Sequence, residues 1–281
     1  MLISNCFSKF SSVAAAALLL FSVPASQADP LTLDINHRAN TIETSVELTQ
    51  LVSFDLKIKF DNAVGLSAEN FTVDAQLLSV TDPSLVSRLP DNLLTALPTA
   101  FPVQISITPD PNKGFSFSGA YEIEIYTKSL HYTEGSPLRL FHSHANGTFE
   151  DMTTMTGAGS MRVRGNGGQF SDFVILADLR SKSSVIATKF ARMQNFVSAQ
   201  QSNLDYSALN ALATALNAIE TALNANQTGQ ALAETQQLIN LLEADDGTLF
   251  PNVWRSAGDL VNVQGRMLGM ATTLRYSLRT L

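Results

Sequence analysis

The stretch FSDFVILAD, Phe170 to Asp178, decides how the rest of the chain is interpreted. Every residue from Phe173 to Ala177 is apolar, and the run is too short for a typical helix. Three glycines stand just before it, at positions 165, 167 and 168. A short run of β-branched and aromatic residues after a turn is typical of a strand covered on both faces. We therefore predict that this stretch is the last central strand of a β-sandwich.

The chain before this strand alternates between apolar and polar residues in several segments. In the clearest one, 54–61, Phe, Leu and Ile alternate with Asp and Lys, which predicts a half-buried antiparallel strand. Asp82-Pro83 predicts the start of a short helix, and Asn146-Gly147 predicts a hairpin turn. About eight to ten short strands between turns rich in Gly, Pro and Asn predict an immunoglobulin-like sandwich of antiparallel sheets.

After Arg180 the apolar residues recur at helical spacing. The pattern predicts helices at 184–200, 206–225 and 229–244, and a fourth from Pro251 to the C-terminus. Short connections between such helices favour an antiparallel four-helix bundle. The predicted fold is therefore α+β with two domains, a sandwich over residues 29–180 and a helical bundle over residues 181–281.

The first 28 residues have the features of an export signal. Lys9 precedes an apolar core at 13–23, Pro24 ends that core, and small residues precede a predicted cleavage between Ala28 and Asp29. A retained N-terminal anchor is the alternative. No later stretch approaches 18 consecutive apolar residues, so we expect no membrane span after removal of the signal. The predicted location is periplasmic or extracellular.

Composition restricts the classes of partner and site. The single cysteine, Cys6, lies in the predicted signal, so the mature chain has neither a disulfide nor a thiolate metal site. Residues 29–180 hold 10 Lys and Arg against 18 Asp and Glu, whereas residues 181–281 hold 7 of each. This balance argues against nucleic acid as a partner, because nucleic-acid binding depends on Lys and Arg meeting phosphates.

The best candidate for a metal site is His142 with His144. Residues two apart on a strand face the same way, so both imidazoles could reach one divalent ion. Glu150 and Asp151 follow across the Asn146-Gly147 turn and could add oxygen ligands. The alternative is that these residues are the hydrophilic part of a hairpin near water. We expect no other cofactor.

Patterns that support catalysis or calcium binding are weak. Residues 157–161 read GAGSM and lack the second glycine of a Gly-x-Ser-x-Gly nucleophile elbow. Glu122 and Glu124 are paired carboxylates on the predicted solvent face of a strand. Asp245-Asp246 offers too few oxygens for a calcium loop. We therefore expect a protein that is not an enzyme.

Two resemblances cover most of the predicted mature chain. The segments PLRLF, FEDMTT, GSMRVRG and FSDFVILAD, between 137 and 178, resemble the closing half of β-sandwich domains in bacterial surface proteins. The Ala- and Leu-rich segment from Leu204 onward resembles FIMAH, a small helical domain at the C-terminus of secreted bacterial proteins. The whole arrangement is similar to a family of uncharacterised secreted proteobacterial proteins. These resemblances imply an extracytoplasmic binding or structural role.

The leading functional hypothesis is a non-catalytic exported module that contacts an envelope or extracellular protein, or a surface glycan. Helix faces rich in Asn, Gln, Ser and Thr favour such contact, because they carry little charge to desolvate. One alternative is a metal-dependent enzyme or metal-binding protein that uses His142 and His144. Another is an architectural component of a surface assembly.

Overall fold

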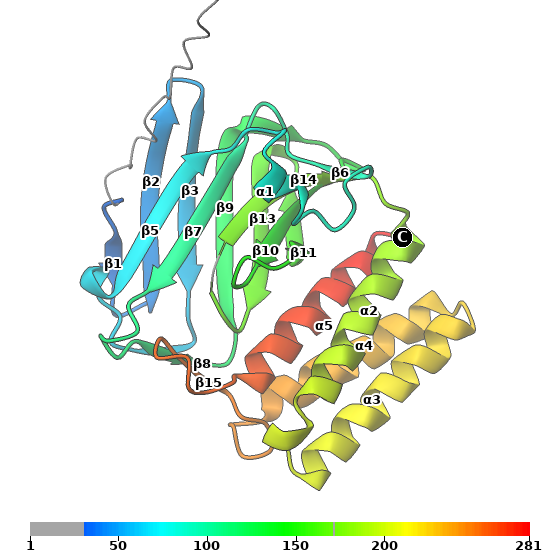
Figure 1. Ribbon diagram of the computed structural model, residues 1–281. Helices are drawn as coiled ribbons and strands as arrows, with labels where there is room; N and C mark the ends of the chain where they lie inside the picture. The colour runs from blue at the N-terminus through cyan, green and yellow to red at the C-terminus, as the bar shows by residue number, and fades with distance from the viewer. Residues whose placement is uncertain (1–30, 171) are drawn as a thin grey trace, which may run out of the picture.

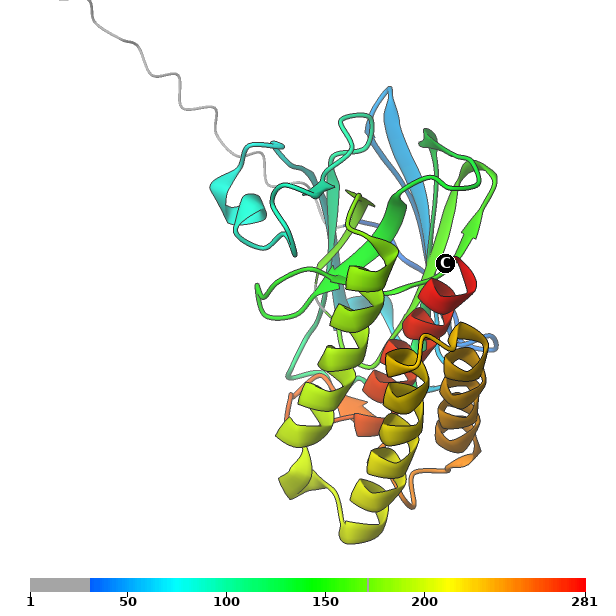
Figure 2. The same ribbon diagram turned by 90° about the vertical axis from the view of Figure 1, so that its right-hand side faces the viewer.

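The computed structural model describes residues 31–170 and 172–281 (Figure 1). The predicted signal peptide and its cleavage point at Ala28 and Asp29 lie outside the described residues. The chain is α+β, with three antiparallel sheets and, after residue 181, four long helices. Figures 1 and 2 show these helices gathered on one side of the sheets.

Two larger sheets share one hydrophobic core. The first has the order β1 (Asp34–Asn36), β2 (Thr41–Thr49), β3 (Val52–Lys59), β9 (Tyr121–Tyr132), β13 (Gly159–Gly167), β12 (Thr153–Gly157). The second has the order β11 (Glu150–Asp151), β10 (Leu138–Ser143), β14 (Asp172–Asp178), β7 (Val103–Pro109), β5 (Phe71–Leu77), and β6 (Thr95–Ala96) pairs with β14. Ile58 and Ile123 of the first sheet and Ile105 and Ile175 of the second belong to this core. The alternating pattern of 54–61 is confirmed, since β3 buries every second residue.

Strand β14 is the predicted central strand, and it pairs with β10 on one side and β7 on the other. Phe173 and Ile175 enter the main core. Val174 and Leu176 point to the opposite face, where a smaller apolar cluster contains Phe141, Phe149 and Leu85 of α1 (Pro83–Val86). The expectation that this strand is covered on both faces is confirmed. Asp82 caps α1 as predicted, with its carboxylate accepting from the Ser84 amide at 2.8 Å.

Three of the four predicted long helices are confirmed to within two residues at each end. They are α2 (Lys182–Ala199), α3 (Tyr206–Asn224) and α4 (Thr228–Ala244), with short 3-10 turns η1 (Ala68–Asn70) and η2 (Gln201–Asn203) elsewhere. Together with α5 (Val263–Arg279) they enclose a second hydrophobic core, separate from that of the sheets. Helix α5 lies closest to the strands and packs on β12 and β13 (Figure 1).

The predicted start of the fourth helix at Pro251 is wrong, because α5 begins only at Val263. The intervening segment forms β15 (Val253–Arg255), which pairs with β8 (Ser116–Ser118). Strand β8 also pairs with β4 (Asn62–Val64), and these three strands make the third sheet. Trp254 thereby packs on the aromatic rings of the β region, with its ring centroid 5.4 Å from that of Phe117. Pairing with a distant strand, which local spacing does not reveal, decides the structure of this segment.

Candidate functional site

The surface where α2 and α5 meet β11, β12 and β13 is called the junction here. The helix and the strands are closely packed at the junction, and only glycine fits at two positions of α5. A Cβ on Gly265 would overlap the Gly119 carbonyl, and a Cβ on Gly269 would lie 2.7 Å from the Asn166 carbonyl oxygen. Asn262 caps α5 by accepting from the Gly265 amide at 2.7 Å. Its Nδ2 donates to the Gly119 carbonyl, also at 2.7 Å. One side chain therefore fixes both the start of the helix and its distance from the strands.

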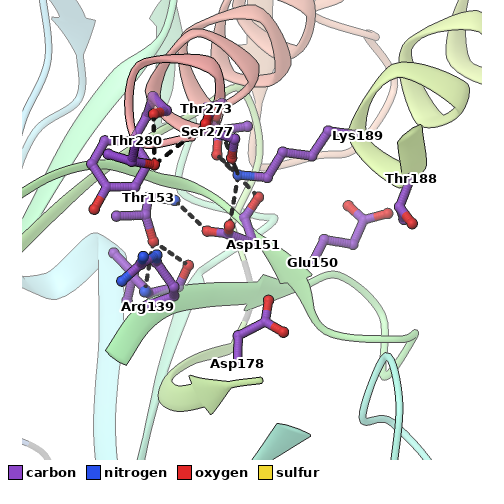
Figure 3. A network of polar contacts seen from close by, with 12 residues as sticks. Arg139, Glu150, Asp151, Thr153, Asp178, Thr188, Lys189, Thr273, Ser277 and Thr280 are labelled. Carbon is purple, nitrogen blue, oxygen red and sulfur yellow. Dashed lines mark hydrogen bonds and ion pairs between the residues drawn. The ribbon is translucent and has the colours of Figure 1, made fainter. Parts of the chain in front are cut away.

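A buried ion pair lies at the centre of the junction (Figure 3). Lys189 of α2 is 2.6 Å from Asp151 of β11, and their side chains are 5% and 3% exposed. The Lys189 ammonium also donates to Thr273 Oγ1 at 2.7 Å and to Ser277 Oγ at 2.8 Å, both on α5. Asp151 accepts from the Thr153 amide at 2.8 Å. The pair therefore ties two helices to the sheet with every charged atom hydrogen-bonded.

Burial acts to raise the pKa of Asp151, but the Lys189 ammonium and the bonds from Lys189 and Thr153 together hold that pKa below its ordinary value. Asp151 is therefore a carboxylate at neutral pH. A fully bonded buried pair of this kind fixes how two elements are placed relative to one another, and gives little net stability over apolar packing. We interpret it as structural.

The two predicted metal-binding histidines lie at the end of β10 and make different contacts. His142 lies on β10 and faces the junction, 5.2 Å from the Phe173 ring, while His144 is exposed just beyond the strand. The Nδ1 atom of His144 is 2.8 Å from the Phe170 carbonyl oxygen. Burial, with a smaller contribution from the charge of Arg192, lowers the pKa of His142 to about 3, so the ring is neutral.

The predicted oxygen ligands are engaged elsewhere. Glu150 pairs with Arg192 at 3.1 Å, and Asp151 pairs with Lys189. Within residues 31–170 and 172–281, no group of three or more His, Cys, Asp or Glu side chains is placed to hold a metal ion. A site at His142 and His144 remains a prediction.

An open groove of about 540 Å³ runs along the edge of the junction. Its lining is mostly polar, and its charge is negative, with one lysine, five carboxylates and four amides: Lys59, Asp61, Glu122, Glu243, Asp245, Asp246, Asn62, Asn166, Asn252 and Gln264. The sheets and the helices both contribute residues. Gln264 donates to the carbonyl oxygens of Leu242 and Asp245, at 2.6 and 2.5 Å, which stiffens the helical wall. The groove can accept hydrogen bonds from hydroxyl or amino groups.

The paired carboxylates of β9 are held in surface ion pairs. Glu124 accepts from Arg162 and from Arg164, each at 2.5 Å, and Glu122 lies 3.9 Å from Arg164. Both carboxylates therefore have arginine partners on β13, and the Glu124 side chain, 13% exposed, is more buried than the predicted solvent face implies.

Sequence reasoning missed Lys189, Arg192 and Arg266. A signal existed for Lys189, because it lies three residues after Ile186 and four before Met193, inside the apolar stripe of α2. A lysine in such a stripe requires a buried partner. The two arginines had no comparable signal.

Residues 15–281 match the model of a protein family described as a family of unknown function, DUF6689. The chain belongs to this family. No curated protein is significantly similar to this DUF6689 protein. In the part of the DUF6689 chain that the structure describes, no helix is both long and apolar enough to cross a membrane.

Proposed function

We propose that this DUF6689 protein is a non-catalytic, exported module of the bacterial envelope or extracellular space, which binds a surface glycan or a partner protein in the acidic groove. The proposal includes an immunoglobulin-like sandwich and a four-helix bundle, the latter similar to FIMAH, in a proteobacterial protein. The predicted signal at 1–28 supports export.

The composition of the groove is the observation that carries the proposal. Five carboxylates and four amides line the groove with one lysine. Asp245 and Asp246 also accept hydrogen bonds from residues 248–250, so Asp61, Glu122 and Glu243 are the carboxylates that can serve as acceptors for a ligand. Glycan hydroxyls, amino sugars and lysine side chains all supply donors that suit such a surface. The buried Lys189–Asp151 pair of the junction is used for packing and is not available to a ligand.

The test uses the chain from Asp29 onward with purified bacterial polysaccharides, peptidoglycan and envelope proteins as immobilised ligands. Asp61→Asn with Glu243→Gln removes two groove charges, and Glu134→Gln on an exposed turn outside the groove is the matched control. Binding that the double variant loses and the control retains supports the proposal. Equal binding by all three proteins, or turnover of a bound polymer, contradicts it.

The predicted export is tested by a separate experiment. Expression of residues 1–281 in a Gram-negative host, followed by N-terminal sequencing of the protein outside the cytoplasm, should give a chain that begins at Asp29. A chain that keeps its first 28 residues would support the anchor alternative.

The metal alternative predicts a different result. One equivalent of zinc or copper would copurify with the chain and would be lost in a His142→Ala/His144→Ala variant.

A further inference from the structure

A small cavity of about 40 Å³ lies inside the junction, distinct from the acidic groove. His142, Glu150, Gly168, Arg192 and Arg266 are among the residues that line it. They come from β10, β11, the turn before β14, and helices α2 and α5. A cavity needs about 10–15 Å³ of such space to hold one water molecule, so this one has room for a small group.

Two nitrogen atoms in the wall of this cavity are buried without a hydrogen-bond partner among the described residues, Nε2 of His142 and Nε of Arg192. The Arg192 Nε always carries a hydrogen, and neutral imidazole can carry its hydrogen on Nε2. Buried donors are almost always paired in folded proteins. An unpaired arginine donor beside an unpaired imidazole nitrogen that can donate therefore points to an acceptor that the described side chains do not supply.

The net charge of the side chains that line the cavity is positive. Arg192 and Arg266 bring two positive charges, and Glu150, 3.1 Å from Arg192, offsets one of them. Arg266 is held in place by stacking, with its guanidinium carbon 4.3 Å from the centroid of the Phe196 ring. The excess positive charge favours an anion and opposes a divalent cation at this place.

We propose that this cavity binds a compact oxyanion, of the phosphate, sulfate or carboxylate class. The Nε–H of Arg192 and the Nε2–H of His142 donate to it, and Arg266 balances its charge. Arginine N–H groups match the oxygens of such anions in geometry as well as in charge. The anion is either free in solution or the acidic terminal group of a larger molecule.

The test titrates uniformly ¹⁵N-labelled protein with inorganic phosphate, sulfate and acetate at constant ionic strength, and follows the imidazole nitrogens by NMR. The chain has four histidines, and a His142→Gln variant assigns the signal of interest. We expect the Nε2 signal of His142 to move and those of His37 and His131 to stay. An acidic monosaccharide, glucuronate, in parallel distinguishes a free anion from a terminal carboxylate.

Variants test the assigned donors by calorimetry. Arg192→Met and Arg266→Met should each weaken phosphate binding about tenfold or more, because the first loses a charge-assisted hydrogen bond and the second a balancing positive charge. Arg255→Met, which removes an exposed arginine outside the cavity, should leave the affinity unchanged. Arg192→Lys keeps a positive charge beside Glu150 but lacks Nε, and it serves if Arg192→Met does not fold.

Two results would overturn the proposal. If none of the anions moves the His142 signal, the cavity holds water only. If binding persists unchanged in both arginine variants, the anion lies elsewhere on the molecule.

Discussion

Lys189 shows how one residue can hold the junction together. Its ammonium contacts Asp151 and two hydroxyl groups of α5, in a place that neither charge would enter alone. The desolvation of each charge is offset only while the other is present.

Replacing Lys189 by Met should lower the free energy of unfolding by about 3–5 kcal/mol, because Asp151 is left buried without its partner. Urea denaturation followed by circular dichroism measures the change. Lys57→Met is the matched control, since the Lys57–Glu43 pair is 48% exposed on both sides and such pairs contribute about 0–1 kcal/mol. Adding Asp151→Asn to Lys189→Met should recover much of the loss. If Lys189→Met lowers the free energy of unfolding no more than Lys57→Met does, the importance of the buried pair for stability is contradicted.

The same pair predicts a dependence of stability on pH. The pKa of Asp151 lies below its ordinary value of 3.8 in the folded chain, so below about pH 4 the unfolded chain binds the proton more readily. Its contribution to stability is therefore present above that pH and is lost as the pH falls through the folded pKa. The difference in unfolding free energy between the wild-type chain and Asp151→Asn should shrink between pH 6 and pH 3. A constant difference would show that folding does not change the pKa of Asp151, which would contradict the lowered pKa of the buried pair.

Among the elements, α5 has the most constrained surroundings. Its glycines let the helix backbone approach the carbonyl groups of Gly119 and Asn166, where no side chain fits. The position of α5 therefore requires that neither Gly265 nor Gly269 carries a side chain.

Gly265→Ala should lower the unfolding free energy by about 1–3 kcal/mol, the usual range for overpacking, although alanine favours a helix intrinsically. Gly229→Ala is the control, because a Cβ there meets nothing within 4 Å and the change should be neutral or stabilising. Thermal denaturation of the two variants side by side measures the contrast. Equal melting temperatures would mean that α5 can move away from the strands at no cost.

The sequence allowed prediction of elements whose signals are local. Helices α2, α3 and α4 follow from the spacing of their apolar residues, and Asp82-Pro83 is sufficient to start α1. The segment from Pro251 to Val261 has helix-like spacing too, but β8 offers Val253–Arg255 a strand partner from more than a hundred residues earlier. The site was predictable only in part for the same reason. His142 stood out in its hairpin, whereas Arg192 and Arg266 reach its cavity through helix packing that no local pattern encodes.

At the scale of the whole molecule, the β region and the helices keep separate cores and still depend on each other. Trp254 comes from the C-terminal part but covers Phe115, Phe117 and Phe170 of the β region, with ring centroids 5.4 to 6.2 Å away. Residues on both sides of the predicted domain limit near residue 180 therefore belong to one aromatic cluster.

A fragment of residues 29–180 should melt about 5–10 °C or more below the β region of the full chain, because it lacks about 2–3 kcal/mol of tryptophan burial and also the packing of α5 on β12 and β13. A synthetic peptide of residues 249–260 should restore part of the difference, and the same peptide with Trp254→Ala should not. Differential scanning calorimetry measures all three. A fragment as stable as the full chain would show that the two parts are independent.

The position of β15 late in the sequence also determines when folding of the β region can be completed. During synthesis the strands up to Asp178 emerge first, but the third sheet stays unfinished until residues 253–255 follow. The nascent chain thus carries an uncovered aromatic surface from the synthesis of Phe170 until that of Trp254, a state that attracts chaperones. For a chain that is exported, as we propose, this delay is useful. It postpones the final closure until nearly the whole length has passed.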